Sequence, residues 1–142
     1  MVSLKKVLQG KGHDVWSIGP EASVYDAIEM MADKEVGALV VMEGDSLVGL
    51  LSERDYARKV ILQGRSSRDT KIKDIMTSRV AYARPEQSVE EGMGMMTDKR
   101  IRHLPVMDGD KLLGVVSIGD LVKAIIEEQQ QVIEQLEQYI SR

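Results

Sequence analysis

The order of apolar and polar positions along the chain predicts a set of alternating strands and helices. Residues 24–31 carry apolar side chains at spacings of three and four, the pattern of one face of a helix. Two short apolar runs, 38–42 and 46–51, follow with a Glu-Gly-Asp turn between them, which is typical of a β-hairpin. Ser52 then stands where the next helix should begin. With a short strand expected at 15–18, the order is β-α-β-β-α.

The same order is repeated farther along the chain. When the sequence is shifted by 65 positions, residues 20–56 fall on residues 85–121 with 17 identical pairs out of 37. Ser23 and Ser88 coincide, and each is expected to be the N-cap of a helix, with an acidic residue three positions later as its capping-box partner. A strand is again expected at 80–83. The chain is therefore a duplicated β-α-β-β-α unit of the α+β class.

These patterns divide the chain into four segments. We expect the first repeat at 7–62, a linker at 63–74, the second repeat at 75–126 and a helical extension at 127–142. The linker begins with a polar, glycine-containing stretch, and a short helical turn is expected at 71–76. Two copies are too few for a solenoid, so the simplest architecture is two small units that share one core.

The last predicted helix continues well beyond its counterpart in the first repeat. Its apolar residues recur at spacings near three and four, at Val122, Ile125, Val132, Leu136 and Tyr139, so one face is apolar. This face either folds over the chain's own core or packs on a partner chain. Three consecutive glutamines and the length beyond the repeat favour the partner chain.

Composition and charge narrow the possible functions. The 142 residues are 43% hydrophobic and 30% charged, which indicates a globular chain. The net charge is −4 and the isoelectric point about 5.2, so we expect no nucleic-acid and no anionic-membrane partner. The absence of cysteine excludes disulfides and thiolate chemistry. With no signal peptide or membrane span recognised, a cytoplasmic protein is expected.

Each repeat places a serine three residues before an aspartate at the start of its second helix. These pairs are Ser52 with Asp55 and Ser117 with Asp120. The spacing is an ordinary capping arrangement. It also suits a nucleotide, because a helix start offers N–H groups and a positive dipole end to phosphate. A carboxylate one turn further on could accept both hydroxyls of a ribose. The spacing alone leaves both interpretations open.

The two repeats differ around this motif. Arg102 and His103 stand in the second repeat where the first has Gly37 and Ala38. Two small residues are thereby replaced by cationic or hydrogen-bonding ones. Arg54 adds a cation within the motif of the first repeat. We therefore expect two binding sites that differ in ligand or in affinity.

The duplicated motif resembles a known family. Together with Arg102-His103-Leu104-Pro105-Val106 and Ser117-Ile118-Gly119-Asp120-Leu121-Val122, it is similar to a tandem pair of cystathionine-β-synthase-type (CBS) domains, the Bateman module, over about residues 7–126. The resemblance implies two units packed through their sheets about a pseudo-twofold axis. It also implies two clefts that bind adenosine ligands such as AMP, ADP, ATP, and sometimes NAD or S-adenosylmethionine. Many members are fused to a channel or an enzyme, whereas this chain has no room for one and is expected to be a stand-alone module.

The resemblance also assigns roles to individual residues. It implies that Asp55 and Asp120 hold ribose, and that Ser52 and Ser117 hold phosphate. The base would lie against the first strand of a unit and against the backbone at the start of its hairpin. The residues concerned are Ser17, Ile18, Gly37 and Ala38 in the first repeat, and Tyr82, Ala83 and His103 in the second. Phosphates would be neutralised by Arg54, Arg102 and His103.

Three functions compete on these observations: a nucleotide-sensing module, an enzyme, and a ligand-free dimerisation or scaffold subunit. The enzyme is disfavoured because the chain has two histidines and no cysteine for a metal site, and neither serine has a recognisable base nearby. His13 is expected in an exposed loop, and Lys11 lacks the spacing of a phosphate-binding loop. We therefore expect a homodimer that needs no cofactor, binds AMP, ADP, ATP or NAD, and signals to an unidentified regulated protein.

Overall fold

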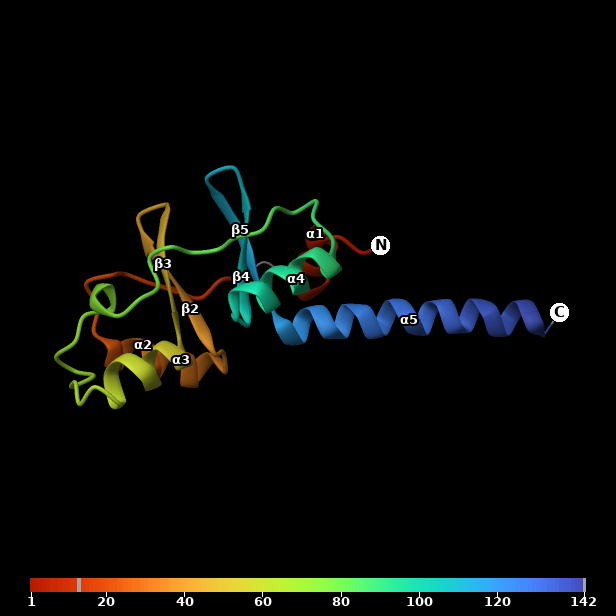
Figure 1. The fold of residues 1–142 in the computed structure, drawn as a ribbon. Helices are drawn as coiled ribbons and strands as arrows, with labels where there is room; N and C mark the ends of the chain where they lie inside the picture. Colours follow the sequence, from red (N-terminus) through yellow and green to blue (C-terminus); the bar gives the residue numbers. More distant parts are fainter. Residues whose placement is uncertain (13, 142) are drawn as a thin grey trace. The chain divides into compact units, whose positions relative to one another are not determined.

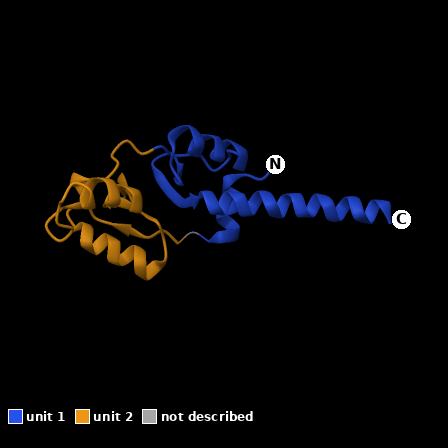
Figure 2. Cartoon of the chain, turned by 60° about the horizontal axis from the view of Figure 1, so that its bottom comes forward, with its two compact units in different colours: residues 1–13, 81–142 blue, residues 14–80 orange. Residues whose placement is uncertain are grey.

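The computed structural model describes residues 1–12 and 14–141 (Figure 1). Within them the chain forms two compact units (Figure 2). Unit 2 contains residues 14–80, and unit 1 combines residues 1–12 with 81–141. Each unit has helices and a small sheet, so the predicted α+β class is confirmed. Each unit also has its own buried cluster.

Unit 2 follows the predicted order of elements. These are β1 (Ser17–Ile18), α2 (Val24–Lys34), β2 (Ala38–Glu43), β3 (Ser46–Ser52), α3 (Glu53–Tyr56), a π-helical turn (Ala57–Ile61) and a 3-10 turn (Ile72–Asp74). The strand order is β1-β2-β3, with β1 parallel to β2 and β2 antiparallel to β3. Gly44 turns the hairpin with a φ of +62°, which glycine adopts without strain. The predicted hairpin is confirmed.

A buried aliphatic cluster holds unit 2 together. Helix α2 presents Val24, Ala27 and Met31 to it, on the face that their spacing predicts. The segment 63–74, expected as a linker, contributes as well. Its Ile72 is fully buried and donates a backbone hydrogen bond of 3.0 Å to the loop before α2. This segment is therefore integrated into the fold of unit 2.

Unit 1 repeats the order, preceded by an additional helix. Its elements are α1 (Leu4–Lys11), α4 (Val89–Lys99), β4 (His103–Asp108), β5 (Lys111–Ser117) and α5 (Ile118–Ile140). The strand predicted at 80–83 is reduced, among the described residues, to a single bridge at Ala83. Pro105 explains the loss, because it stands where β2 has Val40. The Val40 N–H donates to the Trp16 carbonyl at 3.4 Å, and proline has no N–H for the equivalent bond.

Helix α1 packs on unit 1 although it precedes the first repeat. Leu4 and Leu8 are buried in the core of unit 1, and the Leu4 N–H donates to the Gln87 carbonyl at 2.8 Å. Leu8 lies over Gly114 of β5, where a Cβ atom would be 2.7 Å from a methyl carbon of Leu8. Residues 7–12, expected in the first repeat, therefore fold with the second. The start of α1 corresponds to the 3-10 turn of unit 2, because the N–H groups of Leu4 and Lys5 bond Gln87 and Pro85 as those of Ile72 and Lys73 bond Ala22 and Pro20. The aligned residues 20–56 and 85–121 include neither segment, so the repeat pattern could not place α1.

Helix α5 extends beyond the core of its own unit (Figure 1). Leu121 is buried, and Ile118, Ala124 and Ile125 pack partly on the core. From residue 129 to 141 every residue is exposed, and the helix is unbroken through the three glutamines. None of the described helices is both long and apolar enough to cross a membrane. The exposed apolar side chains of α5 are Val122, Ile126, Val132, Ile133, Leu136, Tyr139 and Ile140.

Candidate functional site

Each unit places a complete capping box where its hairpin runs into the next helix. In unit 2 the Asp55 N–H donates to the Ser52 hydroxyl oxygen at 3.1 Å, and the Ser52 N–H donates to Asp55 Oδ2 at 3.0 Å. In unit 1 the same two bonds join Asp120 and Ser117, at 3.1 Å and 2.8 Å. The capping interpretation of the motif is therefore confirmed in both repeats. A capping box also fixes the orientation of the carboxylate, which a binding site requires.

The backbone amides at these helix starts are mostly engaged within the protein. The first amide of α3, from Glu53, donates to the Gly37 carbonyl at 3.0 Å, and that of α5, from Ile118, donates to the Arg102 carbonyl at 2.8 Å. The third amide of each helix bonds the capping serine. A phosphate at either start would therefore depend on nearby cations more than the sequence led us to expect. In unit 2 the exposed Arg54, next along α3, is the cation expected for this role.

In unit 2 the start of β2 lies beside the capping box. Ala38 pairs with Ser52 across the hairpin, and Gly37 bonds the start of α3. Ser17 and Ile18 lie one strand away, because β1 pairs with the middle of β2. The structure thus brings Gly37 and Ala38 next to the motif and places the β1 residues beside them in the same sheet.

In unit 1 the corresponding residues differ in how far they are exposed to solvent. His103 pairs with Ser117 across the hairpin, and the exposed Arg102 precedes it. Tyr82 is 54% exposed, whereas Ala83 is fully buried and both its N–H and its carbonyl bond to β4. Of the two residues of the first strand predicted to contact a base, Tyr82 presents its side chain to solvent and Ala83 does not.

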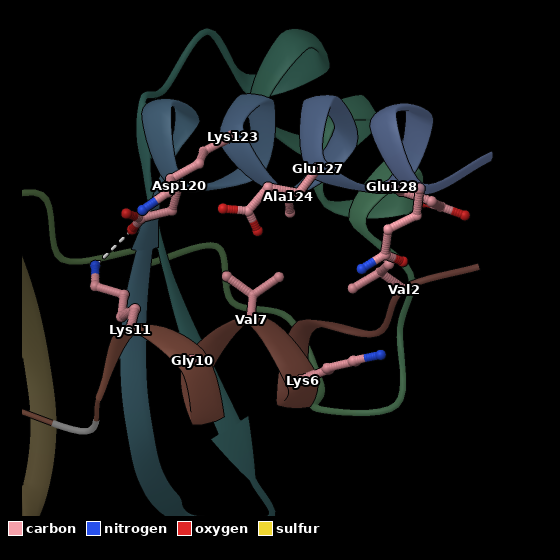
Figure 3. Close-up of a pocket in the computed structure, with 11 residues that line it drawn as sticks. Val2, Lys6, Val7, Gly10, Lys11, Asp120, Lys123, Ala124, Glu127 and Glu128 are labelled. Atoms are coloured by element: carbon pink, nitrogen blue, oxygen red, sulfur yellow. Dashed lines mark hydrogen bonds and ion pairs between the residues drawn. The ribbon is translucent and has the colours of Figure 1, made fainter. Parts of the chain in front are cut away.

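Each capping aspartate is also paired with a lysine. Asp55 Oδ1 lies 3.2 Å from Nζ of Lys59, one turn along the same helical segment. Asp120 Oδ2 lies 2.5 Å from Nζ of Lys11, which comes from α1 (Figure 3). Each lysine also donates to a backbone carbonyl of its own unit, at 3.0 Å and 2.9 Å respectively. Both carboxylates are therefore held in place and partly neutralised.

The Asp120 carboxyl is shifted towards its ionised form. Burial raises its pKa, but the hydrogen bonds from Lys11 and from the Ser117 backbone, together with the Lys11 charge, outweigh burial and hold the pKa below its ordinary value. The side chain is 25% exposed, so part of it faces solvent. An ionised, partly exposed carboxylate accepts hydrogen bonds from hydroxyl groups.

Lys11 and Asp120 form one end of a pocket of about 290 Å³ between α1 and α5 of unit 1 (Figure 3). Val7 and Ala124 line its middle, and charged side chains of both signs surround it. No group of three or more His, Asp or Glu side chains in the described parts of the chain could hold a metal ion. His13 lies outside the described residues.

Comparison with known proteins decides the family. The model of the CBS domain matches the chain twice, at residues 12–61 and 72–127. The chain belongs to the CBS domain family. The predicted resemblance is therefore confirmed over both repeats.

The CBS relatives and structures agree with this assignment. The mitochondrial CBS domain-containing protein CBSX3 of Arabidopsis thaliana is 46% identical over 123 residues, which are 83% of this chain and 60% of that protein. The solved structure of a CBS-domain protein from Burkholderia ambifaria is 48% identical, with a TM-score of 0.87, and the match covers 90% of this chain and 96% of that one. A CBS domain pair solved in complex with 5′-methylthioadenosine and S-adenosyl-L-methionine is 22% identical and shares the fold, with a TM-score of 0.79 over 90% of this chain and 98% of that one.

Proposed function

We propose that this CBS domain pair is a regulatory module that binds an adenine nucleotide (AMP, ADP, ATP or NAD) and signals to a partner protein by a change of shape. CBS domain pairs generally bind adenosine ligands in regulatory roles. The observation that carries the proposal for this chain is the duplicated capping box. In both units it fixes an aspartate at a helix start, beside the first residues of a hairpin strand.

In this proposal the aspartate binds the ribose of the ligand. Asp120 uses Oδ2 for its bonds to Ser117 and Lys11, so Oδ1 is the oxygen that would accept the ribose hydroxyls. Asp55 has both oxygens engaged, with Ser52 on Oδ2 and Lys59 on Oδ1. A ligand in unit 2 must therefore displace a lysine, and we expect the site in unit 1 to bind more tightly.

Cationic side chains would hold the phosphates. Arg102 and His103 lie beside the capping box of unit 1, where unit 2 has Gly37 and Ala38. Charge-assisted hydrogen bonds to phosphate are stronger than neutral ones. The site in unit 1 is therefore expected to favour the more strongly anionic ligands.

Thermal shift and calorimetry test the proposal. A ligand at about 100 times its dissociation constant adds roughly 2.7 kcal/mol of stability, which corresponds to roughly 5–10 °C in Tm for a chain of this size. We expect AMP, ATP or NAD to produce such a shift, and Asp120→Ala to weaken binding of that ligand at least tenfold. Asp26→Ala is the matched control, because Asp26 occupies the same cap position in α2.

The outcome separates ligand binding from capping. Both Asp→Ala variants are expected to lose some stability, since each alters a helix start. If Asp120→Ala binds the ligand as well as Asp26→Ala does, Asp120 is only a cap. If no adenosine ligand shifts the Tm, the ligand-free scaffold is the better account.

We also propose that the module is a homodimer in which α5 of a second copy covers the exposed end of α5. Five of the seven exposed apolar residues of α5 lie on two adjacent lines with a repeat of seven positions, Ile126-Ile133-Ile140 and Val122-Gln129-Leu136, in which Gln129 is the single polar residue. Isoleucine along one line of the seam is typical of parallel two-stranded coiled coils, and a polar residue in the seam, here Gln129, would specify the register at a cost in stability. No glutamate of the segment lies on these lines, so two copies can pair without placing carboxylates in the seam.

Sedimentation equilibrium tests the homodimer. Ile133 is 47% exposed in the single chain, so Ile133→Glu is expected to leave the fold intact and yield monomers. Gln138→Glu adds the same charge on the opposite side of the helix and is expected to leave the dimer unchanged. A monomeric wild-type protein, or a dimer that tolerates Ile133→Glu, would show that α5 does not pair in this way.

A further inference from the structure

Lys11 reaches the Asp120 site from a helix outside the duplicated sequence. Its Nζ donates to Asp120 Oδ2 at 2.5 Å and to the Val115 carbonyl at 2.9 Å. Helix α1 is anchored by the buried side chains of Leu4 and Leu8. The ammonium group is therefore delivered to Asp120 by a fixed element, although the two residues are 109 positions apart.

In unit 2 the lysine that pairs with the capping aspartate comes from the same helical segment. Lys59 Nζ lies 3.2 Å from Asp55 Oδ1 and donates to the Ile75 carbonyl at 3.0 Å. That pair lies within one helical segment, four residues apart, so breaking it affects only that segment. The Lys11–Asp120 pair instead joins α1 to the start of α5, and breaking it releases the end of α1.

We propose that Lys11 is the charge-sensing residue of the Asp120 site: it neutralises Asp120 when no phosphate is present and transfers to the phosphate of a bound nucleotide. The proposal rests on the proposed function, since it assumes that Asp120 binds the ribose. It adds that Lys11 makes the site discriminate a phosphorylated ligand from the neutral nucleoside.

The discrimination follows from the charges at the site. A neutral nucleoside that binds Oδ1 of Asp120 leaves Lys11 on Oδ2 and gives the ammonium group no additional partner. A nucleotide places a phosphate near the same carboxylate, where it gives Lys11 a new charge-assisted bond and lowers the repulsion between the two anions. The lysine stem is flexible and the Lys11 side chain is 37% exposed, so the ammonium group can move between the two partners. Lys6 and Lys123 line the same pocket together with Glu127 and Glu128 (Figure 3), so Lys11 is distinguished from the other pocket lysines by its direct bond to Asp120.

Lys11 lies at the end of α1, close in the chain to the start of unit 2. Lys11 is the last residue of α1, and unit 2 begins only three residues later, at residue 14. Loss of the bond to Asp120 therefore acts at a connection between the two units. We expect nucleotide binding to change the hydrogen-exchange protection of the last turn of α1, and adenosine to change it less.

Calorimetry with AMP and adenosine tests the proposal. The measured quantity is the ratio of the adenosine to the AMP dissociation constant, determined in an Asp55→Ala background so that the site in unit 1 dominates the signal. Lys11→Met removes the charge but keeps the length of the side chain. Lys11→Arg keeps the charge, and Lys5→Met is the control on the exposed face of α1. Lys11→Gln is a second neutral variant, used if Lys11→Met does not fold.

The ratio of the two dissociation constants distinguishes a charge-sensing Lys11 from a merely structural one. We expect Lys11→Met to lower the ratio about tenfold or more, mainly through weaker AMP binding, and Lys11→Arg and Lys5→Met to preserve it. An unchanged ratio in the folded neutral variants overturns the proposal, as does an equal loss of affinity for both ligands, which would indicate a merely structural lysine. If the wild-type protein binds neither ligand, the proposed function fails and this inference fails with it.

Discussion

Substituting Gly114 tests whether α1 docks on β5, the contact that positions Lys11. A Cβ atom at residue 114 would lie 2.7 Å from Leu8 Cδ2 and 3.3 Å from Leu8 Cδ1, well inside the roughly 3.5–4.0 Å of a favourable carbon contact. Because Leu8 is 1% exposed, its side chain has little room to move away. Gly114→Ala is therefore expected to lower the free energy of unfolding by about 1–3 kcal/mol, the usual cost of overpacking.

A double-variant cycle makes this prediction specific to the Leu8 contact. Leu8→Ala alone should cost about 2–5 kcal/mol, because it leaves a cavity in the core of unit 1. In the double variant each substitution relieves the other, since the new methyl group at 114 enters the space that Leu8 vacates. The combined loss is expected to be smaller than the sum by about 1 kcal/mol or more. Urea unfolding followed by circular dichroism supplies the four free energies.

Gly94 provides the matched control for this cycle. It lies inside α4 with nothing within 4 Å of the position its Cβ would take. Gly94→Ala is therefore expected to raise the free energy of unfolding by about 0.4–1 kcal/mol, through the lower flexibility of the unfolded chain. Additive losses for Gly114→Ala and Leu8→Ala would refute the docking of α1 on β5. The delivery of Lys11 to Asp120 would then lose its structural basis.

Two further predictions concern pH. Hydrogen bonds from Lys71 and Lys73 lower the pKa of Glu21 from its ordinary value of 4.5 to about 2. The two ion pairs therefore stabilise the folded protein fully above pH 4.5, and this stabilisation is lost as the pH falls towards 2. An NMR titration of Glu21 with a midpoint near 4.5 would contradict the pairing, and Lys73→Met should raise the midpoint. Likewise, Lys11→Met should raise the pKa of Asp120 and so reduce the stability that is lost when the pH falls below 3.8, the ordinary pKa of an aspartate. An unchanged Asp120 titration in this variant would show that the ion pair does not form in solution.

The local parts of the fold could be predicted from the sequence. The hairpin turns and the serine N-caps each depend on residues only a few positions apart, so the duplicated pattern predicted them correctly. The predicted capping boxes of Ser23 with Asp26 and Ser88 with Glu91 are wrong, because neither carboxylate accepts from the N–H of its capping serine. The shortened first strand of unit 1 could also have been predicted. Pro105 replaces Val40 in the duplicated alignment, and a missing N–H is a local property of one residue.

The non-local parts could not be predicted in the same way. Helix α1 has an amphipathic pattern, but nothing in that pattern says that Leu4 and Leu8 pack on the second repeat and not on the first. The position of Lys11 follows from that packing, so its bond to Asp120 was missed. The first amides of α3 and α5 are engaged by the carbonyls of Gly37 and Arg102, the residues just before β2 and β4. This depends on the approach of two elements and has no signature in the capping motif.

Binding of an adenosine ligand at the capping boxes is measured most directly by an amide-resolved NMR titration of the ¹⁵N-labelled protein with AMP. We expect saturable shifts of the Gly119 and Asp120 amides, followed at higher concentration by those of Arg54 and Asp55, and loss of the first set in Asp120→Ala. If the amides at both helix starts keep their shifts in millimolar AMP while the protein remains folded, the account is wrong.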